Sequence, residues 1–266
     1  MTQINRFSTR QASNTSAFRE IVDLDIEHIG DTMASLKELP RAQLETMAAA
    51  GEQILECYRV LEKGSSNIVA EVLRGGGEFF EFDHYPDGDI YDSDTHSQFY
   101  YHSHREGEHG HFHTFLREEG MPKDCRPVSQ SEAEFMTERD DTISHLIAIS
   151  MNRAGFPIAL FTTNRWITAD NWYSADDVIR MLDRFEMDLA WPSWPANIWV
   201  TAMLRLFRPQ IEELVRTRDA TVADWQKNHP DSDAFEDRAC DITSQRKISV
   251  AAQIKRVHQA LESAAA

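Results

Sequence analysis

Five of the eleven histidines in this chain lie in one short stretch, FYYHSHREGEHGHFHTF, from Phe99 to Phe115. Imidazole nitrogens bind zinc, copper, iron and nickel well, and the stretch holds no cysteine that would add thiolate chemistry. Catalytic metal sites commonly use three protein ligands and leave another position open. The residue types therefore indicate a histidine-only site for one divalent transition metal. We favour iron, with zinc or copper as alternatives.

The spacing of these histidines predicts a β-hairpin. Side chains alternate between the two faces of a strand, so every second residue shares a face. A two-residue turn at Glu106–Gly107 would use glycine where positive φ is needed. His102 then opposes His111. Tyr100 opposes His113 in the same register, and all five histidines are expected on one face, with the aromatic residues of the opposite face forming core.

The candidate site residues divide into three expected roles. The expected metal ligands are His102, His104, His111 and His113. The expected catalytic residues are Tyr100 and Glu108. The residues expected to support the ligands or to face the substrate are His84, His96, Gln98, His109 and Arg165. Of the five clustered histidines, His109 is nearest the turn and is the one we expect to lie outside the ligand set.

Two further histidine and arginine positions have an ordinary structural interpretation. His145 heads an apolar strand and is interpreted as a core residue with a satisfied hydrogen bond. Arg165 follows a buried strand and could either meet an anionic substrate or pair with a surface carboxylate.

The histidine cluster as a whole could also be a solvated surface that responds to pH. Several imidazoles without an ion would repel one another once charged, which favours the metal interpretation.

Part of the cluster resembles a known metal motif. In the cupin motif a HxH pair is followed by a glutamate, and His102, His104 and Glu108 match that piece. The flanking glycines do not match, and the chain has no second cupin motif downstream. The longer string HYPDGDIYDSDTHSQFYYHSHREGEHGHFHTFL is similar to the signature of a bacterial family of unknown function. That second resemblance implies no activity.

Charge and composition narrow the expected partners. The formal net charge of −17 argues against binding to nucleic-acid phosphates and to anionic membrane surfaces. The N-terminal residues lack the apolar core of a secretory signal, and Cys57, Cys125 and Cys240 are too widely spaced for a disulfide framework. We expect a cytoplasmic protein with a small-molecule substrate, which could form a homodimer or use a partner protein.

The pattern of elements predicts an α+β fold, with an antiparallel sheet flanked by N-terminal and C-terminal helices. Residues 1–16 are expected to form a flexible arm, and 17–266 a single domain. Within that domain we expect helices over 17–74, strands over 75–168 and helices over 169–266. The strands are expected to include 77–85, before a turn at PDGD, and the last helix is expected to span 241–261.

These observations favour a metal-dependent enzyme that acts on a small molecule. A non-haem iron oxidoreductase is our first hypothesis, and a zinc hydrolase is close behind it. The alternatives are a protein that stores or transfers copper, nickel or zinc without catalysis, and an interaction module in which the histidines are a pH switch. An enzyme should hold about one ion with an open position, whereas a metal store should expose the histidines and bind more than one.

Overall fold

A six-stranded sheet forms the centre of the protein, seen here in a computed structural model that describes residues 36–128 and 142–264. The strand order is β1-β2-β3-β4-β5-β6, and each neighbouring pair is antiparallel. The strands are β1 (Tyr85–Tyr91), β2 (Ser97–His102), β3 (Gly110–Arg117), β4 (Ile143–Met151), β5 (Pro157–Thr163) and β6 (Ile242–Lys247). The expected arm, 1–16, and the expected helical residues 17–35 lie outside the described residues.

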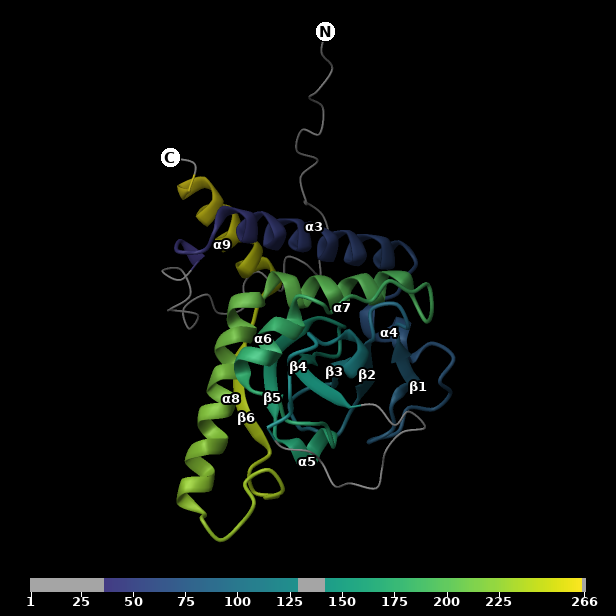
Figure 1. Cartoon of the computed structure of the whole chain (residues 1–266). Helices are drawn as coiled ribbons and strands as arrows, with labels where there is room; N and C mark the ends of the chain where they lie inside the picture. Colours follow the sequence, from purple (N-terminus) through teal and green to yellow (C-terminus); the bar gives the residue numbers. More distant parts are fainter. Residues whose placement is uncertain (1–35, 129–141, 265–266) are drawn as a thin grey trace.

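Helices lie before β1, between β5 and β6, and after β6, which confirms the α+β fold. They are α3 (Arg41–Lys63), α4 (Ile68–Leu73), α5 (Arg165–Thr168), α6 (Ala175–Leu182), α7 (Trp194–Leu206), α8 (Arg208–Asn228) and α9 (Val250–Ser263), with a 3₁₀ turn at Glu118–Gly120. In Figure 1, α3 crosses the top of the view, where it packs against α7 and α9, and α8 runs down beside β6. No helix within the described ranges is long and apolar enough to cross a membrane.

Local sequence signals account for most of these helix boundaries. α3 begins directly after Pro40, a residue that suits a helix start. α6 begins after Ser174, whose side chain accepts a hydrogen bond from the backbone N–H of Asp177. The long helical pattern around Pro209 is two helices, α7 and α8, because proline is tolerated only in the first turn of the second.

The two faces of the sheet have different chemistry. Phe99, Tyr101 and Phe112 lie on one face and are completely buried. The ring of Phe112 lies 5.5 Å from that of Trp199 in α7, so the helical layer covers this face. The helices thus bury the apolar face of β2 and β3. The histidines of the two strands project from the other face, and this separation of core from site was expected from the alternation.

Two predicted elements were wrong. Residues 77–84 form no strand, and the first strand is β1. The PDGD sequence lies within the bounds of β1, but the register with β2 is irregular between Tyr85 and Ile90, and Gly88 and Asp89 have positive φ. The aromatic alternation of 77–84 reflects ring packing, since Phe79 stacks on His109 and Phe82 stacks on His104. At the other end, Ile242–Lys247 is strand β6 and not the start of the last helix.

The edge of β5 explains the conformation of β6. Backbone groups at an open sheet edge need partners, and β6 supplies them along β5. The hydroxyl of Thr162 also lies within hydrogen-bond distance of those of Thr243 and Ser244, at 2.8 and 2.7 Å. Helix α9 begins only after Ser249, whose side chain caps it. A long-range pairing has therefore overridden the local helical pattern.

Gly110, at the start of β3, allows the close approach of the two hairpin strands. A Cβ atom there would lie 2.5 Å from the carbonyl oxygen of His102 and 2.6 Å from the hydroxyl of Tyr101. We expect Gly110→Ala to lower the free energy of unfolding by about 1–3 kcal/mol through overpacking, measured by urea denaturation. Gly64→Ala is the control, because its Cβ would meet nothing closer than 3.4 Å. Equal stability of the two variants would contradict the packing at Gly110.

Candidate metal centre

The hairpin has the register expected from the spacing of its histidines. His102 pairs with His111. Tyr100 pairs with His113. β2 ends at His102 and β3 begins at Gly110, so the connection is longer than the expected two-residue turn, but the register is the same. Side chains from both strands are thereby brought together over one face of the sheet.

Three of the clustered histidines form a compact group. His102, His111 and His113 each offer a ring nitrogen, and these nitrogens lie within 4.8 Å of one another. The Nε2 atoms of His102 and His111 are 2.7 Å apart. His111 and His113 are fully buried and His102 is 7% exposed. The triad is therefore an interior site whose accessible side is limited to the slightly exposed His102.

Glu108 orients His111. Its Oε1 atom lies 2.5 Å from Nδ1 of His111, and its side chain is buried. Burial raises the pKa of Glu108, but its interactions with His111, the hydrogen bond with Ser150 and the charge of Arg105 together outweigh burial, so its pKa is lowered. The carboxylate is therefore an acceptor, and His111 donates from Nδ1. This leaves the Nε2 lone pair of His111 directed at the centre of the triad, as in carboxylate–histidine–metal arrangements.

His145 orients the ring of His113, as Glu108 orients that of His111. Nε2 of His145 lies 2.9 Å from Nδ1 of His113, and both rings are buried. Nε2 of His113 is buried and has no hydrogen-bond partner. An unsatisfied buried nitrogen is costly, and a metal ion would satisfy it. The three histidines therefore fit a metal ion.

A β-bulge brings His145 to the site. Thr114 pairs with Ile147, whereas the next residue, Phe115, pairs with His145. Leu146 is the additional residue, and the shift turns His145 onto the face that carries His113. Strict alternation along β4 would have put His145 on the opposite face, which is why its interpretation as an ordinary core residue missed this contact. No local sequence signal marks the bulge.

The histidines of the site are held neutral. Burial is the largest cause, and it lowers the pKa of His102 to about 2 and that of His145 to about 3. Burial also lowers the pKa of His113 well below its ordinary value, and it lowers the pKa of His111 despite the opposing effect of Glu108. Neutral imidazoles are the form that binds a metal, so the ligands need not lose a proton to the solvent at neutral pH.

Three other predicted residues lie beside the triad. The ring of His104 is 4.7 Å from that of His102 and 5.0 Å from that of His111, although the compact group of nitrogens does not include it. Tyr100 lies 5.1 Å from His102, also between ring centroids. His84 stacks on Tyr100 at 3.7 Å, just ahead of β1. These rings surround the accessible side of the site.

His109 does not lie on the face of the sheet where all five clustered histidines were expected. Its Nδ1 atom lies 2.7 Å from the hydroxyl of Tyr101, and its ring stacks on Phe79, so it belongs to the apolar side of the sheet. His109 lies just outside β3, which begins at Gly110, so the alternation of that strand does not orient its side chain. The expectation that all five histidines share a face was therefore incorrect at this position.

The remaining predicted residues have partners elsewhere. His96 precedes β2 in a left-handed conformation and contacts the hydroxyl of Tyr91 through Nδ1, at 2.6 Å. The side chain of Gln98 donates a hydrogen bond from Nε2 to Oδ2 of Asp89 and accepts one from Nε of Arg117. Arg165 is buried, donates to Glu236 and lies over the ring of Phe235. The structural alternative for Arg165, pairing with a carboxylate, is the one observed.

Comparison with known proteins places the chain in a family without assigning an activity. The model of the domain of unknown function DUF6969 matches residues 48–248, so the chain belongs to that family. This agrees with the resemblance of the histidine-rich string to a family of unknown function. No curated protein matches the chain, and no solved structure does. The matched region contains both the hairpin and His145.

Proposed function

We propose that this protein is a metal-dependent enzyme that acts on a small molecule through one ion held by His102, His111 and His113. The observation that carries the proposal is the unpartnered buried Nε2 atom of His113 beside the facing Nε2 atoms of His102 and His111. The support of His111 by Glu108 and of His113 by His145 adds to it. Such partners fix ring orientation at metal sites.

Burial favours an enzyme over a metal store. A store that takes up several ions would expose its histidines, whereas His111 and His113 are fully buried. Three protein ligands hold one ion and leave at least one position for water, oxygen or substrate. The accessible side is bordered by aromatic rings, which suits a small organic molecule.

Iron is the metal that we favour, and oxidation of the substrate is the reaction. An all-nitrogen site with open positions and aromatic surroundings suits iron, and the bound ion would supply redox chemistry with oxygen. Zinc, with hydrolysis as the reaction, is the second choice. Tyr100 is buried, and burial raises the pKa of its hydroxyl, so we assign it a proton-donating role and not that of a base. Because Glu108 contacts His111, we now assign it a positioning role.

Metal handling without catalysis is the second candidate function. His104 contacts two rings of the triad, and the ring of His84 lies 5.5 Å from that of His102. Such additional imidazoles could pass an ion into or out of the buried site. The number of ions bound separates the two candidates, because an enzyme of this design holds one.

Elemental analysis tests the proposed function. Untagged protein from cells supplied with all first-row metals should contain about one equivalent of iron or zinc, as expected for a three-histidine site. Two or more equivalents of copper or nickel would favour metal handling. If the isolated protein contains no metal and the chelator-treated protein takes up none, the proposed function is wrong.

Glu108 provides a sharper test of the support given to the ligands. We expect Glu108→Gln to weaken metal affinity about 10–100-fold, because the neutral amide holds the His111 ring less well and makes it less basic. Competition with a chromophoric chelator measures the change. Glu106→Gln is the matched control, since this glutamate is exposed in the same connection between β2 and β3. Equal affinities of the two variants would contradict the role of Glu108.

A further inference from the structure

Arg105 lies across the site-facing side of the sheet. Its guanidinium carbon is 4.2 Å from the ring centre of Phe161 in β5. That ring is in turn 5.1 Å from the ring of His111. Nη2 of Arg105 donates to Oε1 of Gln245 in β6 at 3.4 Å. The connection between β2 and β3 thus folds back so that a cation lies beside the histidine triad.

One side of this guanidinium has no acceptor. Nη1 of Arg105 is buried without a hydrogen-bond partner. The nearest ion-pair contact is Oε2 of Glu108 at 3.7 Å, beyond hydrogen-bond distance, and the other oxygen of Glu108 is held by His111. A buried N–H of a charged group that lacks an acceptor costs free energy. A ligand with an anionic oxygen would remove that cost.

Small side chains line the sheet beside Arg105. His111 is followed across the sheet by Ser150 and then by Ala159. The next row contains Ala148 between His113 and Phe161. The side chains of Ser150, Ala148 and Ala159 are small, and they lie on the face of the sheet that carries the histidines.

We infer that Arg105 binds a carboxylate group of the small-molecule substrate and so orients the substrate against the metal ion. This inference rests on the proposed function. A guanidinium presents two parallel N–H donors that match the two oxygens of a carboxylate. In a chain with a net charge of −17, a carboxylate needs a local cation to be held. The class of substrate is therefore a small carboxylic acid.

The test uses acetate as the probe and the cobalt-loaded protein as the reporter. The protein is titrated with acetate at constant ionic strength, and the visible absorption of the bound cobalt ion reports the binding. Imidazole serves as a neutral ligand of the same ion. We expect Arg105→Gln to weaken acetate binding about 10–100-fold and to leave imidazole binding unchanged, since only acetate uses the charged hydrogen bonds. Arg105→Lys should recover only part of the lost acetate affinity, because lysine keeps the positive charge but lacks the two parallel N–H donors.

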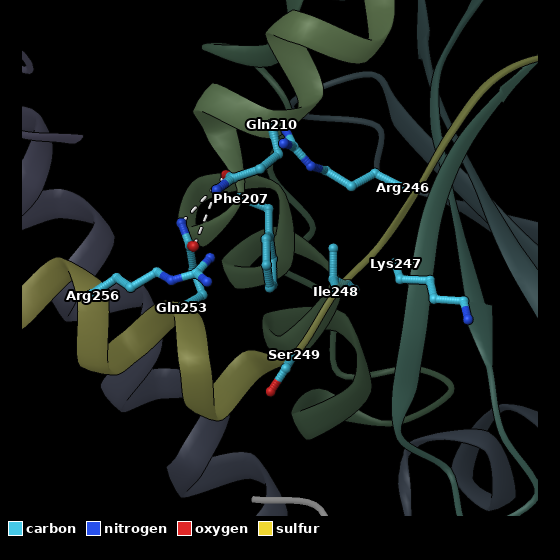
Figure 2. Close-up of a pocket in the computed structure, with 8 residues that line it drawn as sticks. All are labelled: Phe207, Gln210, Arg246, Lys247, Ile248, Ser249, Gln253 and Arg256. Carbon is cyan, nitrogen blue, oxygen red and sulfur yellow. Dashed lines mark hydrogen bonds between the residues drawn. The ribbon is translucent and has the colours of Figure 1, made fainter. Parts of the chain in front are cut away.

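Arg246→Gln is the matched control. Arg246 lies in β6, is 24% exposed against 22% for Arg105, and pairs with Glu213. Figure 2 shows its side chain directed toward Gln210, in a pocket on the helical side of β6, while Lys247 points away from that pocket. The control removes one positive charge without altering the site. Acetate affinity that falls equally in both variants, or in neither, would overturn the inference.

Two further outcomes separate this inference from the proposed function. If the wild-type protein takes up no cobalt, the metal centre is wrong, and saturation-transfer NMR then measures acetate binding to the metal-free protein. A signal lost in Arg105→Gln would support the anion site by itself, and an unchanged or absent signal would overturn it. Inorganic phosphate that binds more tightly than acetate, with the same dependence on Arg105, would overturn the carboxylate assignment.

Discussion

The double variant His102→Ala, His111→Ala is expected to bind no metal. It removes the two facing Nε2 atoms, which lie 2.7 Å apart, and leaves one ligand of the compact triad. A single imidazole does not hold a divalent ion against competition from water and buffer. We expect metal content to fall from about one equivalent to near zero, measured by elemental analysis after equilibration with iron or zinc.

Folding of this variant must be checked independently. Truncation removes the hydrogen bond between His111 and the buried carboxylate of Glu108, which we expect to cost about 1–3 kcal/mol. Circular dichroism and the urea midpoint report that loss. His258→Ala, at an exposed position of α9, is the control and should keep its metal. A folded double variant that retains full metal occupancy would show that the ion, if present, is bound elsewhere.

The metal-free protein is expected to lose stability progressively as the pH falls below about 6.5 and toward the lowered pKa values of its buried histidines. Burial lowers the pKa of His102 to about 2 and that of His145 to about 3, and it also lowers the pKa values of His111 and His113. In the unfolded chain these groups titrate near pH 6.5. As the pH falls below that value, the unfolded state binds protons that the folded state does not, so unfolding becomes more favourable.

The size of this effect follows from the number of protons. A histidine whose pKa in the folded protein lies far below the pH of the measurement contributes up to about 1.4 kcal/mol per pH unit. His102, His113 and His145 are of this kind, so the slope should correspond to at least about three protons. Urea titrations at pH 7, 6 and 5 on chelator-treated protein measure the slope. In the double variant it should fall by at least about one proton, that of His102, whereas His258→Ala should leave it unchanged. A free energy of unfolding that stays flat over this range would mean that the histidines are not buried in neutral form.

The register of the hairpin could be predicted because it depends on local information. Alternation along two short strands and the position of Gly107 are sufficient to oppose His102 with His111. Because the side-chain period of a strand is two, a register that buries Phe99 and Phe112 on one face must place the histidines on the other. The local hydrophobic pattern therefore predicted both the central pair of the site and the face that carries it.

The errors concern segments whose conformation depends on distant partners. Residues 242–247 have no strong strand pattern and become β6 because the edge of β5 needs a partner. The aromatic residues of 77–84 alternate like a strand, but Phe79 and Phe82 stack on histidines that precede β3 or follow β2. In neither case does a short window of sequence contain the group that decides the conformation.

The sequence by itself determined the α+β class, the hairpin and the presence of a histidine-rich face. Only the tertiary structure decided which histidines form the triad, because His109 turns to Tyr101 outside the paired strands. The tertiary structure also decided which side chains contact the triad from other parts of the chain. A bulge in β4 rotates His145 onto His113, and the folded-back connection puts Arg105 over Phe161. Both contacts join segments far apart in the chain, where packing and not spacing sets the distance.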